Sequence, residues 1–513
     1  MIFVDEIGGA FPHINHSPWD NVTLADFVMP WFLFMVGTSL SISLRKFAAT
    51  PTKGTRFVLF RALKLFGLGM LLQGGQPLGW PNLYQYGYNL ATLRFCGILN
   101  RIGFAFLAAS LIELWVPARP TKSTFRHAAV FLTQIWRWLA VGAFVLLHLL
   151  LTLATFVPTW ESRYGYYANA SAPGLLPPSM WFEVKCDVRG TIASPQCSAA
   201  SFFDRILFGQ DHLGVWMTAR LPQCSDCSPG APSQMYRPQC TWMPNATSAE
   251  GDLRWCFAHM YDPEGALATV PTVGSVWLGT HFGRVLRANG LQGEHTAILT
   301  HWTCMAAVLI AAGLAIHWAG LPMNKQLWST SYLLFMAGTC GASLAACYAA
   351  VDAAPNLTAG SNMEGDAEAG PSCHETGGAM GGGRRSGVNN EGRSTIEQRR
   401  LIVRAQAGLQ WLLFPLQAMG MNAILFFFWH GTAEAVINAV YFDAPVPGPP
   451  GTLAHPVPRT ALLGEEGWVH EGLLTGLGIA DAASRQLVFV LLKLACYLAV
   501  AVACFRWKYF WKL

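Results

Sequence analysis

Apolar residues run through this chain in stretches long enough to cross a bilayer, with shorter polar segments between them. A transmembrane helix needs about 20 predominantly apolar residues. The apolar stretch at residues 1–7 is too short to cross, and we interpret it as the second half of a truncated first helix. The sequence therefore predicts an all-α polytopic membrane protein with about ten transmembrane helices. The complete spans are expected near residues 24–44, 57–74, 91–116, 136–157, 266–286, 297–319, 327–350, 405–438 and 486–507.

The composition supports this fold class. Of 513 residues, 52% are hydrophobic and only 12% are charged, whereas soluble domains carry about 25% charged residues. The mean hydropathy is +0.32. We find no glycine-rich phosphate loop, nucleophile elbow or nucleic-acid-binding pattern in the sequence. The first expected partner is thus the lipid bilayer, and nucleic acid is not expected.

Basic residues indicate the orientation, because lysine and arginine concentrate in cytosolic loops. When the spans are threaded in order, the basic clusters all fall on one side, and this side is expected to be the cytosol. Residues 8–21 and 158–265 then lie outside the cytosol. The clusters include Arg45, Lys46, Lys53, Arg56, Arg119, Lys122, Arg126, Arg137, Arg284, Arg287, Arg506 and Lys508.

The long 158–265 segment is a predicted luminal insertion. It holds six of the 13 cysteines, and disulfides form in oxidising compartments. Cys224-x-x-Cys227 resembles half of a zinc site, but no second Cys or His pair follows at a suitable spacing, so disulfides are the preferred interpretation. Asn169 and Asn245 begin glycosylation sequons there. The six cysteines are Cys186, Cys197, Cys224, Cys227, Cys240 and Cys256.

Residues 351–403 differ in kind from the rest. Gly, Asn, Ala, Glu and Arg dominate, and almost nothing is apolar enough to pack, which predicts a disordered cytosolic linker. Residues 1–350 then form a transmembrane domain of eight helices that carries the 158–265 insertion. Residues 404–513 supply the remaining helices of the same domain.

Titratable residues gather where the chain first enters the membrane, and ionisable groups at such positions are functional candidates. His16 is the preferred one, because an imidazole can take a proton from a nucleophile or accept an acyl group itself. Asp5 precedes it and is a candidate to orient the ring. A purely structural role for His16, capping the helix start, remains open. The spacing His13-x-x-His16 would also suit a metal pair, but no metal is expected.

Asp26 lies near the start of a predicted span, where an unpaired carboxylate would be costly, so we expect an arginine partner, Arg94 or Arg101. These two arginines are seven residues apart and share a helical face. The pair is either structural or positions a phosphate-bearing substrate. Four further polar residues flank predicted spans and are candidates for the luminal side, namely Asp262, Glu264, Asn324 and Lys325.

Several stretches together resemble one family. They are "MIFVDEIGGAFPHINHSPWDNVTLADFVMPWFLFMVG", "LRFCGILNRIGFAFL", "FFDRILFGQDHL", "YDPEGALATV", "NKQLWSTSY", "PLQAMGMNAI" and the final "YFWKL". They occur in the order found in the heparan-alpha-glucosaminide N-acetyltransferases and their plant and bacterial relatives, with the plant-like and algal members nearest. In that family the first span begins upstream of the residue that is Met1 here.

The resemblance implies an integral, multi-pass enzyme of the lysosome, vacuole or another endomembrane. It would move acetyl from cytosolic acetyl-CoA to the amino group of a luminal glucosamine-type sugar. His16 falls on the family's catalytic histidine, and Asp5 falls where animal members have an asparagine. On this interpretation Arg94 and Arg101 are candidates to bind the CoA phosphates, and Asn422 is a candidate oxyanion donor.

Two other functions remain open at this stage. One is a transporter of a sugar or small metabolite, in which the same polar groups line a pathway. The other is a receptor-like membrane protein descended from an enzyme, which would bind no CoA. The acceptor sugar, the mechanism (acetyl-histidine or ternary complex) and the oligomeric state, including a homodimer, are also left open by the sequence.

Overall fold

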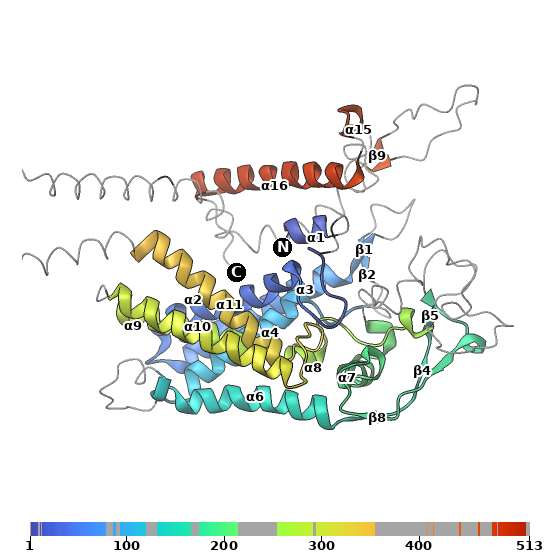
Figure 1. Cartoon of the computed structure of the whole chain (residues 1–513), viewed down its shortest axis with the longest axis horizontal. Coiled ribbons are helices and arrows are strands. Elements are labelled where there is room, and N and C mark those ends of the chain that lie inside the picture. The colour runs from blue at the N-terminus through green and yellow to red at the C-terminus, as the bar shows by residue number, and fades with distance from the viewer. Residues whose placement is uncertain are drawn as a thin grey trace, which may run out of the picture.

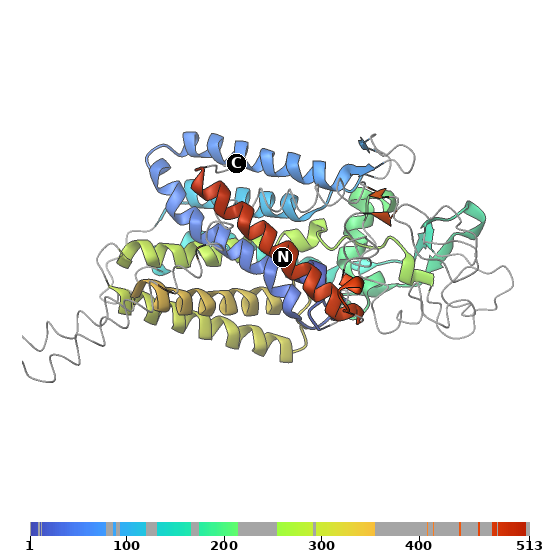
Figure 2. The same cartoon turned by 90° about the horizontal axis from the view of Figure 1, so that it is seen from above.

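The computed structural model describes residues 2–8, 11, 13–77, 86–88, 93–118, 131–165, 174–213, 254–290, 294–353 and 481–508, with short pieces at 408, 414, 441–442, 460–461 and 474–479. In these residues the chain is mostly helical, and the long helices other than the last one form a bundle (Figure 1; Figure 2). The long helices are α2 (Val28–Ser43), α3 (Pro51–Gly74), α4 (Ile98–Trp115), α6 (Ile135–Ala154), α9 (Thr272–Gly290), α10 (His295–Trp318), α11 (Thr330–Tyr348) and α16 (Ala482–Arg506). The short α-helices are α1 (Ile2–Ile7), α7 (Ala199–Phe208), α8 (Ala266–Thr269) and α15 (Leu474–Gly476).

Six helical stretches among the described residues are long and apolar enough to cross a membrane. They confirm a helical membrane protein, and the total of about ten spans stays a prediction. The expected 405–438 span and most of the 351–403 linker lie outside the described residues, although the helix that precedes the linker continues to Ala353. The six stretches are Leu24–Phe47, Ile98–Trp115, Ile135–Ala154, His295–Trp318, Thr330–Asp352 and Ala482–Arg506.

Helix α9 is not among these six, although a span was expected at 266–286. It lies in the middle of the bundle and contacts α2, α4, α6, α10 and α11. Its polar side chains Thr272, Ser275, Thr280, His281 and Arg284 are buried. Since protein rather than lipid surrounds α9, its residues need not be apolar, which explains its lower hydropathy.

Helices α2 and α9 pack backbone to backbone. A Cβ atom placed on Gly37 would lie 1.8 Å from the carbonyl oxygen of Val276, and one on Gly279 would lie 1.8 Å from that of Phe34. Only glycine leaves room for such an approach, which is the usual way that membrane helices pack closely. The contact fixes the middle of α2 against the bundle core.

The segment after α6 lies at one end of the bundle, where its strands and α7 gather (Figure 1; Figure 2). It forms an interrupted antiparallel ribbon in which β3 (Phe156–Val157) pairs with β8 (Val188–Arg189), β4 (Trp160–Ser162) with β7 (Phe182–Val184), and β5 (Tyr164–Gly165) with β6 (Gly174–Leu175). Two further strand pairs are β1 (Gly75–Pro77) with β2 (Tyr86–Tyr88) and β9 (Tyr441–Phe442) with β10 (Thr460–Ala461).

A disulfide joins Cys186 to Cys197 within this segment, and Cys256 is disulfide-bonded as well. Of the six cysteines there, Cys224, Cys227 and Cys240 lie outside the described residues. The free cysteines among the described residues all lie elsewhere, at Cys96, Cys304, Cys340, Cys347, Cys496 and Cys504. The preference for disulfides in this segment is confirmed for the bonds that the structure describes, and Asn169 and Asn245 lie outside the described residues.

Candidate active site

The polar residues before α2 fold around one buried carboxylate. Asp26 is fully buried, and its Oδ2 accepts hydrogen bonds from the backbone N–H groups of Ser17 (3.0 Å) and Thr23 (3.1 Å) and from Thr23 Oγ1 (2.9 Å). Thr23 and Asp26 form a capping box at the start of this helical stretch. The phenol of Tyr332 on α11 donates to the Asp26 carbonyl at 2.6 Å. The local sequence thus folds so that the second carboxylate oxygen is available to His16.

The His16 ring contacts one acidic and one basic side chain, those of Asp26 and Lys325. Its Nδ1 atom is 2.8 Å from Asp26 Oδ1 and also 2.8 Å from Lys325 Nζ, while Lys325 Nζ lies 3.4 Å from Nε2. Lys325 and Asp26 Oδ1 are themselves 3.4 Å apart. The His16 side chain keeps 21% of its surface exposed, whereas that of Asp26 keeps none. The ring is therefore accessible while its two partners are buried.

Lys325 is held in place by a tightly bonded turn before α11. The Asn324 side chain accepts the N–H of Leu327 at 2.8 Å and donates to Asp20 Oδ1 at 3.1 Å. Ser329 Oγ accepts the N–H of Asn324 at 3.0 Å and caps α11. This turn therefore links the α10–α11 connection directly to the segment that carries His16.

The expectation that Asp26 pairs with Arg94 or Arg101 is wrong. Arg94 Nε and Nη2 lie 2.6 Å from the two carboxylate oxygens of Asp262, and Nη2 lies 2.5 Å from Glu264 Oε2. The arginine thus forms a bidentate pair with one acid and a single contact with another. The physical reason is proximity, because the 262–264 turn lies beside Arg94 and α4, whereas Lys325 reaches Asp26.

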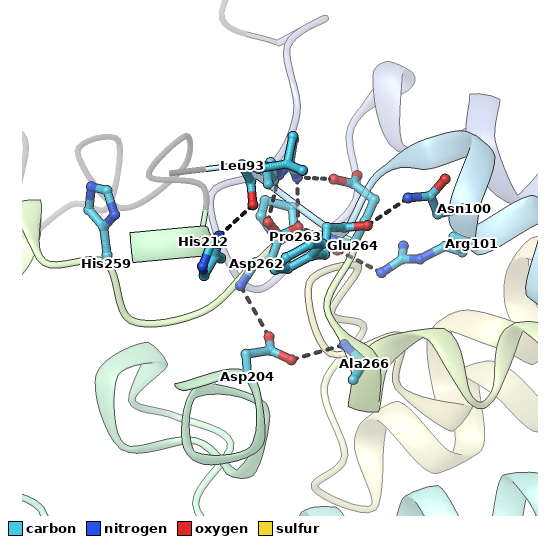
Figure 3. Close-up of polar contacts among 12 residues, drawn as sticks. Leu93, Asn100, Arg101, Asp204, His212, His259, Asp262, Pro263, Glu264 and Ala266 are labelled. Carbon is cyan, nitrogen blue, oxygen red and sulfur yellow. Dashed lines mark hydrogen bonds and ion pairs between the residues drawn. The ribbon is translucent and has the colours of Figure 1, made fainter. Parts of the chain in front are cut away.

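Arg101 supports the same turn from α4. It donates to the Pro263 carbonyl at 2.7 Å, as Figure 3 shows, and its guanidinium lies 5.0 Å from the centre of the Trp328 ring. Asp262 and Glu264 are thereby held by side chains from two sides. Binding of CoA phosphates by Arg94 and Arg101 was the expectation from the sequence; no contact here tests it, and carboxylates and a carbonyl already occupy much of their donor capacity, which favours a different phosphate site.

Asp204 on α7 is a residue that the sequence reasoning missed. Its carboxylate accepts the backbone N–H groups of Asp262 (3.1 Å) and Ala266 (2.9 Å) (Figure 3). Burial raises its pKa to about 7, and the neighbouring Asp262 carboxylate adds to the rise. Two sequence signals could have indicated it: it is an acid in an otherwise amphipathic stretch, "FFDRILF", and it lies in one of the stretches that carry the family resemblance.

The residues around His16 and those around Arg94 are close enough for their charges to interact, as Lys325 shows. Burial lowers the pKa of Lys325, while both Asp26 and Glu264 act to raise it and Arg101 acts to lower it. The structure thus brings seven of the predicted residues into one neighbourhood, and Asn324 adjoins it through Asp20. The side chain of Asp5 and the whole of Asn422 lie outside what the structure describes. The seven are His16, Asp26, Arg94, Arg101, Asp262, Glu264 and Lys325.

A basic pocket of about 450 Å³ lies on the predicted cytosolic side of the bundle. Four arginines line it together with one acid, Glu113, which contacts both Arg284 and Arg137, the latter at 3.0 Å. Two buried nitrogens of Arg284, Nε and Nη1, have no hydrogen-bond partner among the described residues. The sequence analysis used these arginines only to assign orientation. They are Arg45, Arg137, Arg284 and Arg287.

Metal binding has little support in the part of the chain that is described. No group of three His, Cys, Asp or Glu side chains there is arranged to hold a metal ion. His13, the other half of the spacing noted in the sequence, has an exposed side chain.

The fold and the site together define a helical membrane protein with a buried acid–base cluster at one end of its bundle. Over 354 residues, 65% of this chain, it is 25% identical to heparan-alpha-glucosaminide N-acetyltransferase of Mus musculus and covers 44% of that protein. Over 370 residues, 69% of this chain, it is 24% identical to the Homo sapiens protein of that name and covers 47% of it. No family model matches the chain. The two similarities agree with the resemblance to the heparan-alpha-glucosaminide N-acetyltransferases seen in the sequence, and the chain spans less than half the length of these relatives.

Proposed function

We propose that this protein is a membrane N-acetyltransferase that moves acetyl from acetyl-CoA to the amino group of a glucosamine-type sugar. The observation that supports it best is the His16 ring, which is partly exposed and held at Nδ1 between Asp26 and Lys325. A base for an amine nucleophile needs an accessible imidazole with a fixed orientation. The names of the two relatives point to the same reaction.

Acetyl transfer from a thioester to an amine requires that the two reactants are positioned and that one group carries a proton. The amine attacks the thioester carbonyl, a C–N bond forms and the C–S bond breaks. The proton of the amine passes to His16 and then to the departing thiolate, which leaves as CoA thiol. Alternatively, the ring itself accepts the acetyl group and passes it on. Asp26 orients the ring in either case.

The donor site that we propose is the basic pocket at the other end of the bundle. The four arginines that line it are suited to phosphate oxygens, because arginine forks match them. Helix α4 links the two ends, and the 12 residues from Arg101 to Glu113 correspond to a rise of about 18 Å. The thiol arm of CoA would have to cover a distance of this size to bring the acetyl group to His16.

The proposal includes the orientation of the protein in the membrane. The disulfide-bonded segment lies at the end of the bundle that holds His16, and such bonds form in oxidising compartments. The basic pocket lies at the other end, as expected for the cytosolic face. We therefore place His16 on the luminal side of a lysosomal, vacuolar or other endomembrane.

The test is acetyl transfer in membranes that contain the full chain. Labelled acetyl-CoA and glucosamine are supplied, and N-acetylglucosamine is followed for the wild type, His16→Ala and the matched control His13→Ala, an exposed histidine in the same segment. Product from the wild type and from His13→Ala, but not from His16→Ala, supports the proposal. Activity that survives in His16→Ala, or no transfer to any amino sugar by a folded wild type, refutes it.

The donor site is tested separately by CoA binding. We expect Arg284→Gln to weaken binding at least tenfold, since it removes one of the four cations that line the pocket, while Lys53→Gln, an exposed cation on the same predicted side, leaves it unchanged. Equal CoA affinity in both variants would refute the assignment of the pocket.

A further inference from the structure

Two opposite charges act on the His16 ring from different directions. Asp26 Oδ1 lies 2.8 Å from Nδ1. Lys325 Nζ lies 2.8 Å from Nδ1 and 3.4 Å from Nε2, and a nitrogen this close to both ring nitrogens lies over the ring face, so it acts on the ring through its positive charge. Asp26 is therefore not the only charge that influences the protonation of His16.

Asp26 alone would favour a charged ring. A carboxylate in hydrogen-bond contact stabilises the imidazolium, and an imidazolium can neither take the proton of an amine nor accept an acetyl group. The Lys325 ammonium opposes this, because it places a positive charge at the same distance from Nδ1 and 3.4 Å from Nε2. At equal distances the two charges nearly cancel at the ring.

Burial lowers the pKa of Lys325, and two neighbouring acids oppose this shift. Its buried ammonium faces Asp26 from the segment before α2 and Glu264 from the turn before α8, and both acids favour the charged form. Arg101 on α4 faces it with like charge, but Arg101 is itself bonded to the Pro263 carbonyl and stacked near Trp328. Glu264 is shared with Arg94, which ties Lys325 to the whole polar cluster.

We propose that Lys325 is a positioning residue that keeps His16 neutral, the charge state needed by a base or acyl carrier in an acidic compartment. The inference rests on the proposed function for the part that Lys325 plays in catalysis, but the effect of its charge on His16 does not depend on that function. Removing the ammonium takes away a positive charge 2.8 Å from the ring, so that the ring should become charged at a higher pH. Its effect on activity should be greatest at low pH.

The test measures the charge state directly. Diethyl pyrocarbonate modifies only neutral imidazole, and peptide mass spectrometry follows the reaction at His16 as a function of pH in full-length protein. Exposed His13 in the same peptide is the internal reference. We expect Lys325→Met to move the midpoint for His16 upward by about one to three pH units, as a neighbouring charge does. Lys325→Arg, which keeps the charge, should restore the wild-type midpoint, and His13 should not respond.

An unmoved or lower midpoint in Lys325→Met overturns the proposal. If that variant does not fold, because it leaves the Glu264 carboxylate near an apolar side chain, Lys325→Met with Glu264→Gln removes both charges and is compared with Glu264→Gln alone. The same upward shift is expected in that pair, and its absence also overturns the proposal.

Acetyl transfer gives the second readout. The acid limb of its pH profile should move upward with the modification midpoint in Lys325→Met and recover in Lys325→Arg. A loss of rate that is equal at every pH would indicate a merely structural lysine and overturn the proposal. If the wild type transfers no acetyl group, the proposed function fails, while the modification experiment still decides the role of Lys325.

Discussion

Protonation of Asp204 should control how firmly the 262–266 turn is held against α7. The Asp204 carboxylate is buried and accepts the backbone N–H groups of Asp262 and Ala266. That turn carries the two acids that clamp Arg94, so its stability matters for the candidate site. The perturbation is Asp204→Asn, which resembles the protonated acid in size and neutrality but cannot titrate.

The sign follows from the direction of the pKa shift. Burial raises the pKa of Asp204 from 3.8 to about 7, so the folded chain binds this proton more tightly than the opened chain. The stability that it contributes is complete below the unfolded value of 3.8 and is lost as the pH rises through about 7. At about 1.4 kcal/mol per pKa unit, the whole shift amounts to about 4 kcal/mol, of which about 3 kcal/mol falls between pH 5 and pH 8.

Hydrogen exchange of the backbone amides in residues 262–266 measures this term locally. After correction for the intrinsic effect of pH on exchange, protection in the wild type should be about a hundredfold greater at pH 5 than at pH 8. Asp204→Asn should show nearly equal protection at both values. Glu264 does not contribute to the difference between pH 5 and pH 8, because its pKa is lowered and it stays ionised at both values.

Protection that is equal at pH 5 and pH 8 in the wild type, or greater at pH 8, would refute the reasoning. So would a strong pH dependence that persists in Asp204→Asn, since it would have to come from another group.

Three further changes test the packing, the disulfide and the buried acid. Gly279→Ala should prevent the close packing of α2 on α9 and lower the free energy of unfolding by about 1–3 kcal/mol or more. Gly142→Ala should not, because no atom lies within 4 Å of the new Cβ. Equal melting temperatures of the two variants would contradict this. Cys197→Ser should lower stability by about 2–3 kcal/mol, and the difference from wild type should vanish under reducing conditions. Asp26→Asn should turn an amide N–H group toward donors that now bond to the carboxylate, costing about 1–3 kcal/mol; an unchanged melting temperature together with full acetyl transfer would refute the importance assigned to this acid.

Much of this protein was predictable from local sequence. The helices follow from apolar stretches of membrane length, because the bilayer demands about 20 such residues whatever the tertiary structure. His16 was a candidate because an ionisable group where the chain enters the membrane is costly and therefore indicates a function. The disulfide preference follows from six cysteines in one polar segment.

The pairing of these groups was decided only by the tertiary structure. Asp26 was expected to meet an arginine, yet it meets His16, 10 positions before it, and Lys325, which lies 309 positions after His16 in the chain. Asp204 and the pocket at Arg284 were likewise invisible as sites, because each depends on segments that only the fold brings together. Charge type and periodicity fix which residues need a partner, but an ion pair forms over a few ångströms, and the sequence does not carry that distance.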